Sequence, residues 1–453
     1  MNQLTEDYLA FQSNGGPERA EASWRAAQRL RALFGVEHLA RPVYLDREQI
    51  AELDRDLPAL HRLLNDLPAR LCDGDLASFA RLCGATPAQV DAVLATSHPT
   101  GWPLARADLL HTDDRFVAIE TNLAAVGGTE TGELCRAMTA IPEIGEFVAA
   151  RDLTFTDPGI AFREVLRAEA DRIGRGTEAG IAVVCAPEDP PRTRAVFELL
   201  ALLLEEDGYT AVACSLDELS YQGAEVRANG ARVDLVLRFF FLDRVGGQGE
   251  DSLIAPLLDA CRREQVVLLA PFSADLVGGK RAFALPWHSE FAGDFTAEER
   301  ELVARLTPWS HVLRDRISTA DGVLVDALEH CVAERPRLVL KGGMSQAGHD
   351  IVMGRDLTDA QWRAAVSDGL RRRSVVQQLV EAPPEPFVEG WPRTVAERTV
   401  NWGVYVIGGR YAGVMARGAL AGRAGIISYE SGALLGCSFE ERRTGAAPEA
   451  VAS

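Results

Sequence analysis

The sequence predicts an α/β protein with additional α+β elements, and three observations support this fold class. The first hundred residues repeat apolar side chains at helical spacing, which indicates an N-terminal helical region. Residues 180–271 alternate short apolar runs with amphipathic stretches, a pattern typical of parallel β-α-β units. Residues 398–433 indicate a series of strands with a tight turn at Gly408 and Gly409.

The expected elements follow in chain order, and Pro, Gly and Asp separate them. The helical region should contain helices at 17–34, 57–71 and 86–97, followed by further helices at 132–139 and 161–173. The β-α-β region should contain strands at 180–187, 210–219, 231–241 and 266–271. One helix of this region should begin at Pro191 and end at Gly208, and a second helix should span 252–265. A short buried strand is expected at 374–380, leading into a proline-marked linker.

Composition excludes several classes of function. The chain has 453 residues and a formal net charge of -19, which argues against a nucleic-acid partner because such partners require a basic surface. The N-terminus lacks the features of a signal peptide and no apolar run approaches 18 residues, so we expect a cytoplasmic protein without a membrane partner. Eight cysteines occur without a CxxC pair, which favours reduced core thiols over disulfides or zinc ligands.

Residues 104–133 predict a β-hairpin with one polar face. In its first strand Arg106 and Asp108 alternate with apolar residues and should share a face. The second strand also alternates, so Glu120 and Asn122 should share a face with Phe116 and Ala118.

The turn of this hairpin determines which polar residues face each other. A loop with an odd number of residues, centred near Asp114, would place Asp108 opposite Glu120 and Arg106 opposite Asn122. Two carboxylates and an amide oxygen at that spacing are hard ligands of the kind that Mg²⁺ takes. The alternative is an ordinary amphipathic hairpin with one hydrated face.

Two lysines are candidate phosphate ligands. Lys280 follows a flexible Gly-Gly pair, and Lys341 ends an apolar strand before a glycine-rich turn. A lysine at such a strand end can bind phosphates as a point charge beneath loop amides. Neither segment is GxxxxGK[ST], so a Walker A loop is excluded; a solvated side chain is the stronger alternative for Lys280 than for Lys341.

Three further positions carry polar side chains that suggest chemistry. Arg238 lies in an apolar strand and is either a substrate-carboxylate or phosphate contact or a strand-end arginine in water. Gln377 and Gln378 lie where a strand becomes a connector. Arg417 ends a C-terminal strand, where a guanidinium could stabilise a transferring phosphoryl group. The first β-α-β strand is not followed by GxGxxG, which argues against NAD or FAD.

The order of these motifs resembles that of the circularly permuted ATP-grasp ligases, among them the synthetase domain of the glutathionylspermidine synthetases. The resemblance covers roughly residues 104–438: an RxD and then an ExN in the hairpin, two lysines, a VxQ strand and an arginine-bearing strand pair. RxD and ExN match in residue type and spacing, whereas the other motifs match more loosely. In that family the metal-binding hairpin precedes the nucleotide lobes, as it does here.

The resemblance implies an ATP-grasp fold, circularly permuted, and a role for each matching residue. Two Mg²⁺ ions would be held by Asp108, Glu120 and Asn122, while Arg106 would meet the transferred phosphate and Arg417 would steady the acyl phosphate. ATP would be bound by Lys280, Lys341, Gly348, Gln377, Gln378, Leu379 and Val380. The substrate pockets would be built from the helical region, residues 124–131 including Thr129, and the sheet around Arg238.

These expectations define five regions and one reaction. The regions are a helical cap (1–100), a metal-binding hairpin (101–150), an α/β pre-ATP-grasp domain (151–275), nucleotide-binding lobes (276–440) and a tail (441–453). The implied reaction joins a small-molecule carboxylate to an amine at the expense of ATP, with an acyl phosphate as the intermediate and amino acids or small peptides as the default substrates. The alternatives are a phosphotransferase on the same scaffold and a non-catalytic nucleotide-binding protein.

Overall fold

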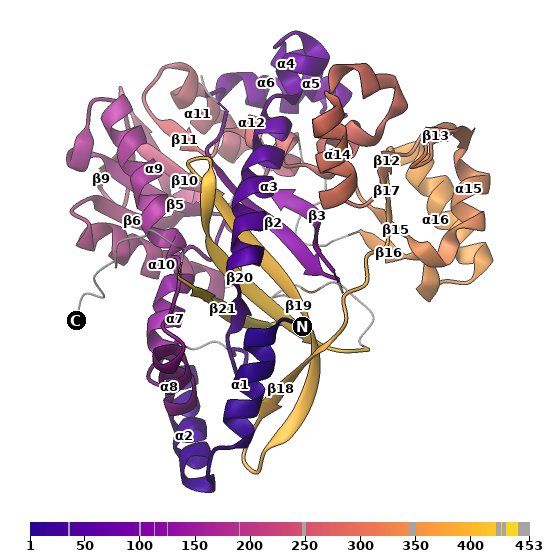
Figure 1. Ribbon diagram of the computed structural model, residues 1–453. Helices are drawn as coiled ribbons and strands as arrows, with labels where there is room; N and C mark the ends of the chain where they lie inside the picture. The colour runs from indigo at the N-terminus through magenta and orange to yellow at the C-terminus, as the bar shows by residue number, and fades with distance from the viewer. Residues whose placement is uncertain are drawn as a thin grey trace.

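The computed structural model describes residues 1–34, 37–98, 101–112, 114–124, 126–189, 191–246, 251–343, 350–422, 427 and 432–442. Helices and several sheets alternate along the chain, so the predicted mixed α/β class is confirmed (Figure 1). Among the helices of these ranges, none has the length and apolarity needed to cross a lipid bilayer. All eight cysteines lie in these ranges and carry free thiols, as predicted.

The largest sheet is antiparallel at its centre and joins strands from both ends of the chain. Its order is β1-β21-β20-β19-β2-β3, with β18 also paired to β19 and β4 to β21. The strands are β1 (Val43–Leu45), β2 (Leu104–His111), β3 (Phe116–Asn122), β4 (Leu153–Thr154), β18 (Glu385–Glu389), β19 (Thr394–Ile407), β20 (Arg410–Leu420) and β21 (Leu434–Glu441). The β2–β3 hairpin therefore lies beside strands that follow it by about three hundred residues (Figure 1).

The turn between β19 and β20 is the predicted one. Gly408 and Gly409 have φ angles of 60° and 76°, a left-handed conformation that glycine adopts without strain. The strands on either side are buried along most of their length because α3 (Arg47–Asn65) and α9 (Pro158–Arg172) pack against this sheet. Asp46 begins α3 with a capping box that includes Gln49.

The β-α-β region forms a separate parallel sheet, as predicted. Its order is β11-β10-β5-β6, and each neighbouring pair is parallel. The strands are β5 (Gly180–Cys185), β6 (Thr210–Ser215), β10 (Leu235–Arg238) and β11 (Val267–Leu269), with helices α10 (Pro191–Glu206) and α11 (Asp251–Arg262). The predicted strand at 231–241 is divided, because its first part, β9 (Ala231–Val233), joins a small antiparallel sheet with β7 (Leu219–Gln222) and β8 (Glu225–Ala228).

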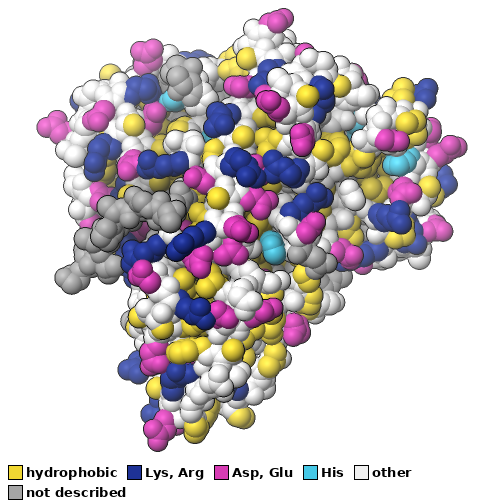
Figure 2. Space-filling view, viewed as in Figure 1, with side chains coloured by type: hydrophobic (Ala, Val, Ile, Leu, Met, Phe, Trp, Pro, Cys, Tyr) yellow, Lys and Arg dark blue, Asp and Glu magenta, His cyan; other side chains and the backbone are white. Residues whose placement is uncertain are grey.

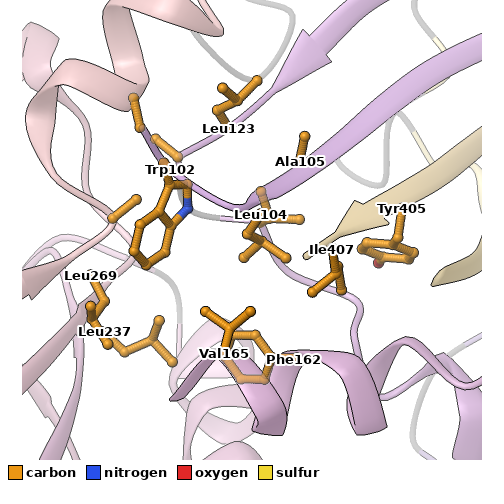
Figure 3. Packing of buried hydrophobic residues seen from close by; sticks show 14 of the residues in the cluster. Trp102, Leu104, Ala105, Leu123, Phe162, Val165, Leu237, Leu269, Tyr405 and Ile407 are labelled. Carbon is orange, nitrogen blue, oxygen red and sulfur yellow. The ribbon is translucent and has the colours of Figure 1, made fainter. Parts of the chain in front are cut away.

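Apolar side chains join the parallel sheet to the large sheet. Figure 3 shows Trp102 and Leu104 close to Leu237 of the parallel sheet and to Ile407 of β19, with Phe162 of α9 completing the contact. All five side chains belong to one continuous core. The two sheets are therefore packed together and hold the hairpin at their junction.

A third, antiparallel sheet has the order β12-β17-β15-β16. Its strands are β12 (Ser310–Val312), β15 (Leu338–Lys341), β16 (Ile351–Met353) and β17 (Val375–Gln378), and the small pair β13 (Arg316–Ser318) and β14 (Leu324–Asp326) lies nearby. Helices α15 (Ala327–Ala333) and α16 (Asp359–Arg372) cover one face, where Trp362 packs with Leu340 and Val376. By alternation, Lys341, Val375 and Gln377 point to the other face.

The helices expected to form one cap lie in two places (Figure 1). Helices α1 (Gln3–Ser13) and α2 (Pro17–Phe34) pack with α7 (Thr131–Met138) and α8 (Pro142–Ala150) around a core of their own. Helices α4 (Leu67–Cys72), α5 (Leu76–Leu82) and α6 (Pro87–Ala95) lie at the opposite end, where α12 (Phe272–Val277) contacts α5 and α6. Two more helices, α13 (Lys280–Ala284) and α14 (Ala297–Leu306), connect this end to the third sheet.

Charged side chains of both signs are spread over the face shown in Figure 2. On the face shown in Figure 2, Lys and Arg side chains are interspersed with Asp and Glu and do not gather into one basic patch. This face therefore lacks the extended basic surface that phosphate backbones require.

Candidate active site

The β2–β3 hairpin has the predicted register at its polar residues. Asp108 lies opposite Glu120 and Arg106 lies opposite Asn122. The cause of this register differs from our expectation. The pairing shifts after Asp108, so Ile119 is the extra residue of a β-bulge. The connecting residues 112–115 are therefore even in number, and the bulge supplies the odd residue.

The bulge also corrects the predicted face of two apolar residues. Ala118 pairs with Leu109 and Phe116 with His111, so both lie on the face opposite to Asp108 and Glu120. There Phe116 packs against Trp402 in the core. The prediction that Phe116 and Ala118 share a face with Glu120 was wrong, because one extra residue reverses every side chain beyond it.

The carbonyl of the bulged residue connects the hairpin to the third sheet. The Ile119 carbonyl oxygen accepts hydrogen bonds from Lys341 Nζ at 3.1 Å and from Gln377 Nε2 at 3.2 Å. Gln377 Nε2 also donates to Ser310 Oγ at 2.9 Å. Residues from three distant segments of the chain thus meet at one backbone oxygen.

The centre of the polar face is Asp108, which is 1% exposed. Its Oδ1 lies 2.9 Å from Arg106 Nε, and its Oδ2 lies 2.6 Å from Arg417 Nη2 and 3.3 Å from Asn122 Nδ2. Burial by itself would raise the pKa of Asp108, but the two arginines outweigh it and hold the pKa well below its usual range. Asp108 is therefore an ionised carboxylate.

Arg417 reaches this site from the interior of β20, three residues before the strand ends, and not from a strand end as predicted. It also donates from Nη2 to Asn401 Oδ1 at 2.8 Å. Its Nε is buried and has no hydrogen-bond partner within the described part of the chain. A buried donor without a partner is costly, so Arg417 retains hydrogen-bonding capacity for a ligand.

Gly403 is a residue of this site that sequence reasoning missed. It lies directly opposite Asp108 on β19, and a Cβ there would lie 2.9 Å from Cδ of Arg106. The missing side chain lets Arg106 cross over β19. A glycine inside a strand is the signal that could have indicated this close approach.

The segment 126–131 folds over the same face. The Gly127 carbonyl accepts hydrogen bonds from Arg106 Nη1 at 3.2 Å and from the Tyr405 hydroxyl at 2.8 Å. Burial raises the pKa of Glu130, while its backbone hydrogen bonds and Arg106 offset part of that effect. Thr129, a predicted substrate contact, is buried and lines a cleft together with Glu130. This segment was expected near the substrates, but Glu130 was not singled out.

The two predicted lysines line one small cavity. Lys280, Lys341, Glu120 and Gln377 line this cavity, together with Ile119, Thr121, Gly278, Phe283 and Val375. Both lysines are at least nine-tenths buried, which contradicts the solvated alternative. Burial lowers the pKa of Lys341 to about 8; Glu120 opposes this effect and the charge of Lys280 adds to it.

The glycines around these lysines behave differently from the expectation. Gly278 and Gly279 form a packed turn between α12 and α13, where a Cβ on Gly278 would lie 2.8 Å from the Leu123 nitrogen. The pair is required for close approach and is not a flexible hinge. Gly348, predicted to contact ATP, lies outside the described residues.

Of the four predicted adenine contacts, only Gln377 lines the cavity. The Gln378 side chain is exposed, and the backbone N–H of Gln378 donates to the Trp309 carbonyl at 2.8 Å. The Leu379 N–H donates to the Arg337 carbonyl at 2.7 Å, and Val380 is half-buried. These amides are occupied within the protein, so the connector is held in place by its own backbone.

Arg238 has neither of the roles considered from the sequence. It is fully buried, pairs with Asp275, and donates to the carbonyls of Ala270, Phe240 and Pro271. All of its N–H groups are used by the protein. We therefore assign Arg238 a structural role in the parallel sheet.

The residues of the hairpin fit a magnesium ion in donor chemistry. Asp108 is ionised, Glu120 lies opposite it and lines the lysine cavity, and Asn122 is the next residue on the same face. Carboxylate and amide oxygens with room for phosphates and water are the usual surroundings of Mg²⁺.

Comparison with known proteins shows a likeness in fold. No protein-family model matches the chain, and no curated protein matches it. A glutathione synthetase-like effector from Globodera pallida, in its apo form, superposes with a TM-score of 0.59 over 94% of this chain and 98% of its own, at 12% identity. A putative gamma-glutamylcysteine synthetase from Methylobacillus flagellatus has a TM-score of 0.42 over 85% and 88%, at 13% identity. The chain thus has the ATP-grasp fold, which it shares with the glutathione synthetase-like protein.

Proposed function

We propose that this protein is an ATP-dependent carboxylate–amine ligase of circularly permuted ATP-grasp topology. One observation carries the proposal: Glu120, Lys280, Lys341 and Gln377, which come from four distant segments, line one cavity beside the arginine-bound Asp108. Cationic, carboxylate and amide groups gathered in this way suit a polyphosphate with its metal ions. The shared fold with a glutathione synthetase-like protein supports the same class.

In this proposal the cavity marks where the phosphates of the nucleotide bind. Lys280 and Lys341 would bind the phosphates as point charges, and the Gln377 side chain would lie beside the nucleotide. Asp108, Glu120 and Asn122 would hold two Mg²⁺ ions, which would supply charge neutralisation along the phosphates. The β2–β3 hairpin in this role supports the permuted order, with the glutathionylspermidine synthetases as the proposed subfamily.

The two arginines would act on the transferred phosphoryl group. Arg106 and Arg417 flank Asp108 and are each only 13% exposed, so their charge is weakly screened by water. The unpartnered Nε of Arg417 would gain an acceptor when a phosphate oxygen arrives. Donors that are already in place where negative charge develops lower the barrier of the transfer.

The reaction would have two steps. An oxygen of the substrate carboxylate would attack the γ-phosphorus of ATP, the bond to the β,γ-bridging oxygen would break, and ADP would leave as an acyl phosphate forms. The neutral amine would then attack the acyl carbon, lose a proton, and expel inorganic phosphate to leave an amide. The segment 126–131, held over the site by Arg106 and Tyr405, would contact these substrates, for which amino acids or small peptides are the proposed class.

The test is ADP release measured against mixtures of amino acids, small peptides and amines. We expect release that depends on both an acid and an amine, and a loss of about 1,000-fold in Asp108→Asn and Glu120→Gln, because both remove a metal-binding charge at the phosphates. Mass spectrometry of the product should show an amide.

Asp114→Asn is the matched control, since Asp114 is an exposed carboxylate at the turn of the same hairpin. Full turnover in Asp108→Asn or Glu120→Gln would contradict the metal assignment. ADP release without an amine, with a phosphorylated product, would indicate a phosphotransferase. ATP binding without any ADP would indicate a nucleotide-binding protein.

A further inference from the structure

Arg281 is a buried arginine next to Lys280, and its role is not explained by the proposed chemistry. Its guanidinium is 8% exposed and donates to three backbone carbonyls: Nη1 to Cys83 at 2.6 Å, Nη2 to Arg372 at 2.8 Å and Nε to Arg373 at 3.0 Å. No carboxylate pairs with it in the described part of the chain. Burial and the nearby Arg373 lower the pKa of Arg281, so this site is costly for a cation.

The three carbonyls belong to two helix ends. Cys83 follows the last residue of α5, and Arg372 and Arg373 end α16, directly before the strand β17 that carries Val375 and Gln377. Carbonyls at a helix C-terminus lack partners within the helix and carry partial negative charge. A single guanidinium therefore connects the N-terminal helices, the helix of Lys280 and the third sheet.

Two glycines make room for this guanidinium. A Cβ on Gly84 or on Gly343 would collide with the Arg281 side chain. Gly84 also has a φ of +80°, as expected after a helix end. Gly343 follows Lys341 by two residues, so Arg281 contacts the chain immediately beyond the second lysine of the cavity.

The two lysines need such a support. Lys280 and Lys341 line the same cavity, and the charge of Lys280 contributes to the lowered pKa of Lys341. Like charges in a buried site separate unless the surrounding backbone holds them. Arg281 is bonded next to one lysine and packed beside the backbone that follows the other.

We propose that Arg281 is a positioning residue that sets the separation of Lys280 and Lys341 for a polyphosphate, and thereby couples the N-terminal helices to the nucleotide site. The inference rests on the proposed function, because the ligand it concerns is the phosphate chain of ATP. Arg281 itself touches neither the phosphates nor the reacting atoms in this account.

The test compares Arg281→Lys with wild type in calorimetric binding of ATP and of adenosine, which lacks phosphates. We expect the ATP affinity to fall by about tenfold to a hundredfold, as a displacement of roughly 1 Å can cause, while adenosine binding is unchanged. Gly343→Ala displaces the same guanidinium from the other side. It should likewise weaken ATP binding and leave adenosine binding unchanged.

Arg335→Lys is the matched control, since Arg335 also donates to two carbonyls, of Gly354 and Leu357, and does not line the cavity. Unchanged ATP affinity in both test variants would overturn the inference, and so would an equal loss for ATP and adenosine, which indicates general damage. Absence of ATP binding by the wild type would instead contradict the proposed function.

Discussion

Two buried arginine–aspartate groups of this protein differ in a way that separates structure from function. Arg238 ends the inner strand β10 of the parallel sheet and pairs with Asp275 of α12, whereas Arg106, Asp108 and Arg417 lie on the polar face of the large sheet. Both aspartates are almost completely buried. In the sequence each of these arginines is a polar residue in an apolar strand, so the sequence does not distinguish their roles. Only their surroundings in the structure do.

The group in the parallel sheet is closed. Arg238 uses all its donors on Asp275 and three carbonyls, and Asp275 also accepts the Leu242 N–H at 3.0 Å. Burial raises the pKa of Asp275, and the single arginine offsets only part of that effect. No hydrogen-bonding capacity of Arg238 remains for a ligand.

The group on the large sheet is open. Asp108 is held by two arginines, which more than offset the effect of burial on its pKa. Arg417 has a buried Nε without a partner in the described residues, and Glu120, opposite Asp108, lines the lysine cavity. We infer that unused hydrogen-bonding capacity beside a cavity, and not burial of charge as such, marks the functional group.

The largest effect should come from breaking the closed group. Asp275→Ala should lower the free energy of unfolding by about 3–5 kcal/mol, because it leaves the Arg238 charge buried and unpaired. Urea denaturation measures the loss. ATP affinity of the folded variant should equal that of wild type, and a weakened affinity would show that the parallel sheet also serves the ligand.

A smaller effect, on rate and not on stability, should come from the open group. Arg417→Met should lower kcat by about 100- to 1,000-fold, since it removes a donor placed where negative charge develops. Its stability to urea should change by less than that of Asp275→Ala, because Arg106 still pairs with Asp108. Both quantities are measured on one preparation, and a large loss of stability with an unchanged kcat would reverse the comparison.

The smallest effect should be a pH dependence that only the open site shows. Burial lowers the pKa of Lys341 to about 8 from 10.5 for an ordinary lysine, and bound phosphates would raise it by favouring the charged form. Above pH 8 binding must therefore take up a proton, so ATP affinity should fall by up to about tenfold per pH unit. Below pH 8 affinity should be constant.

The free energy of unfolding changes with pH in the direction opposite to the ATP affinity. Between about pH 8 and 10.5 the unfolded chain binds a proton at Lys341 that the folded chain does not, so the free energy of unfolding rises with pH across this window. Lys341→Arg keeps its charge and should remove the pH dependence of ATP affinity. A wild-type affinity that stays constant to pH 10 would show that Lys341 does not meet the phosphates.

The sequence by itself determined much of the secondary structure, the parallel sheet, and much of the hairpin. Those features depend on local periodicity and on turn residues such as Gly408 and Gly409, whose conformation is set within a few residues. Even the pairing of Asp108 with Glu120 was accessible, because a hairpin relates residues only twelve positions apart. Interactions between residues close together in sequence are sufficient to determine features of this kind.

Only the tertiary structure decided which polar residues meet. The carbonyl of the bulged residue Ile119 accepts hydrogen bonds from Lys341 and Gln377, more than two hundred residues away. The partner of Arg238, the crossing of Arg106 over Gly403, and the three carbonyls around Arg281 likewise join distant segments. Sequence periodicity does not reveal such contacts, because they arise when packed sheets bring together groups whose spacing in sequence carries no pattern.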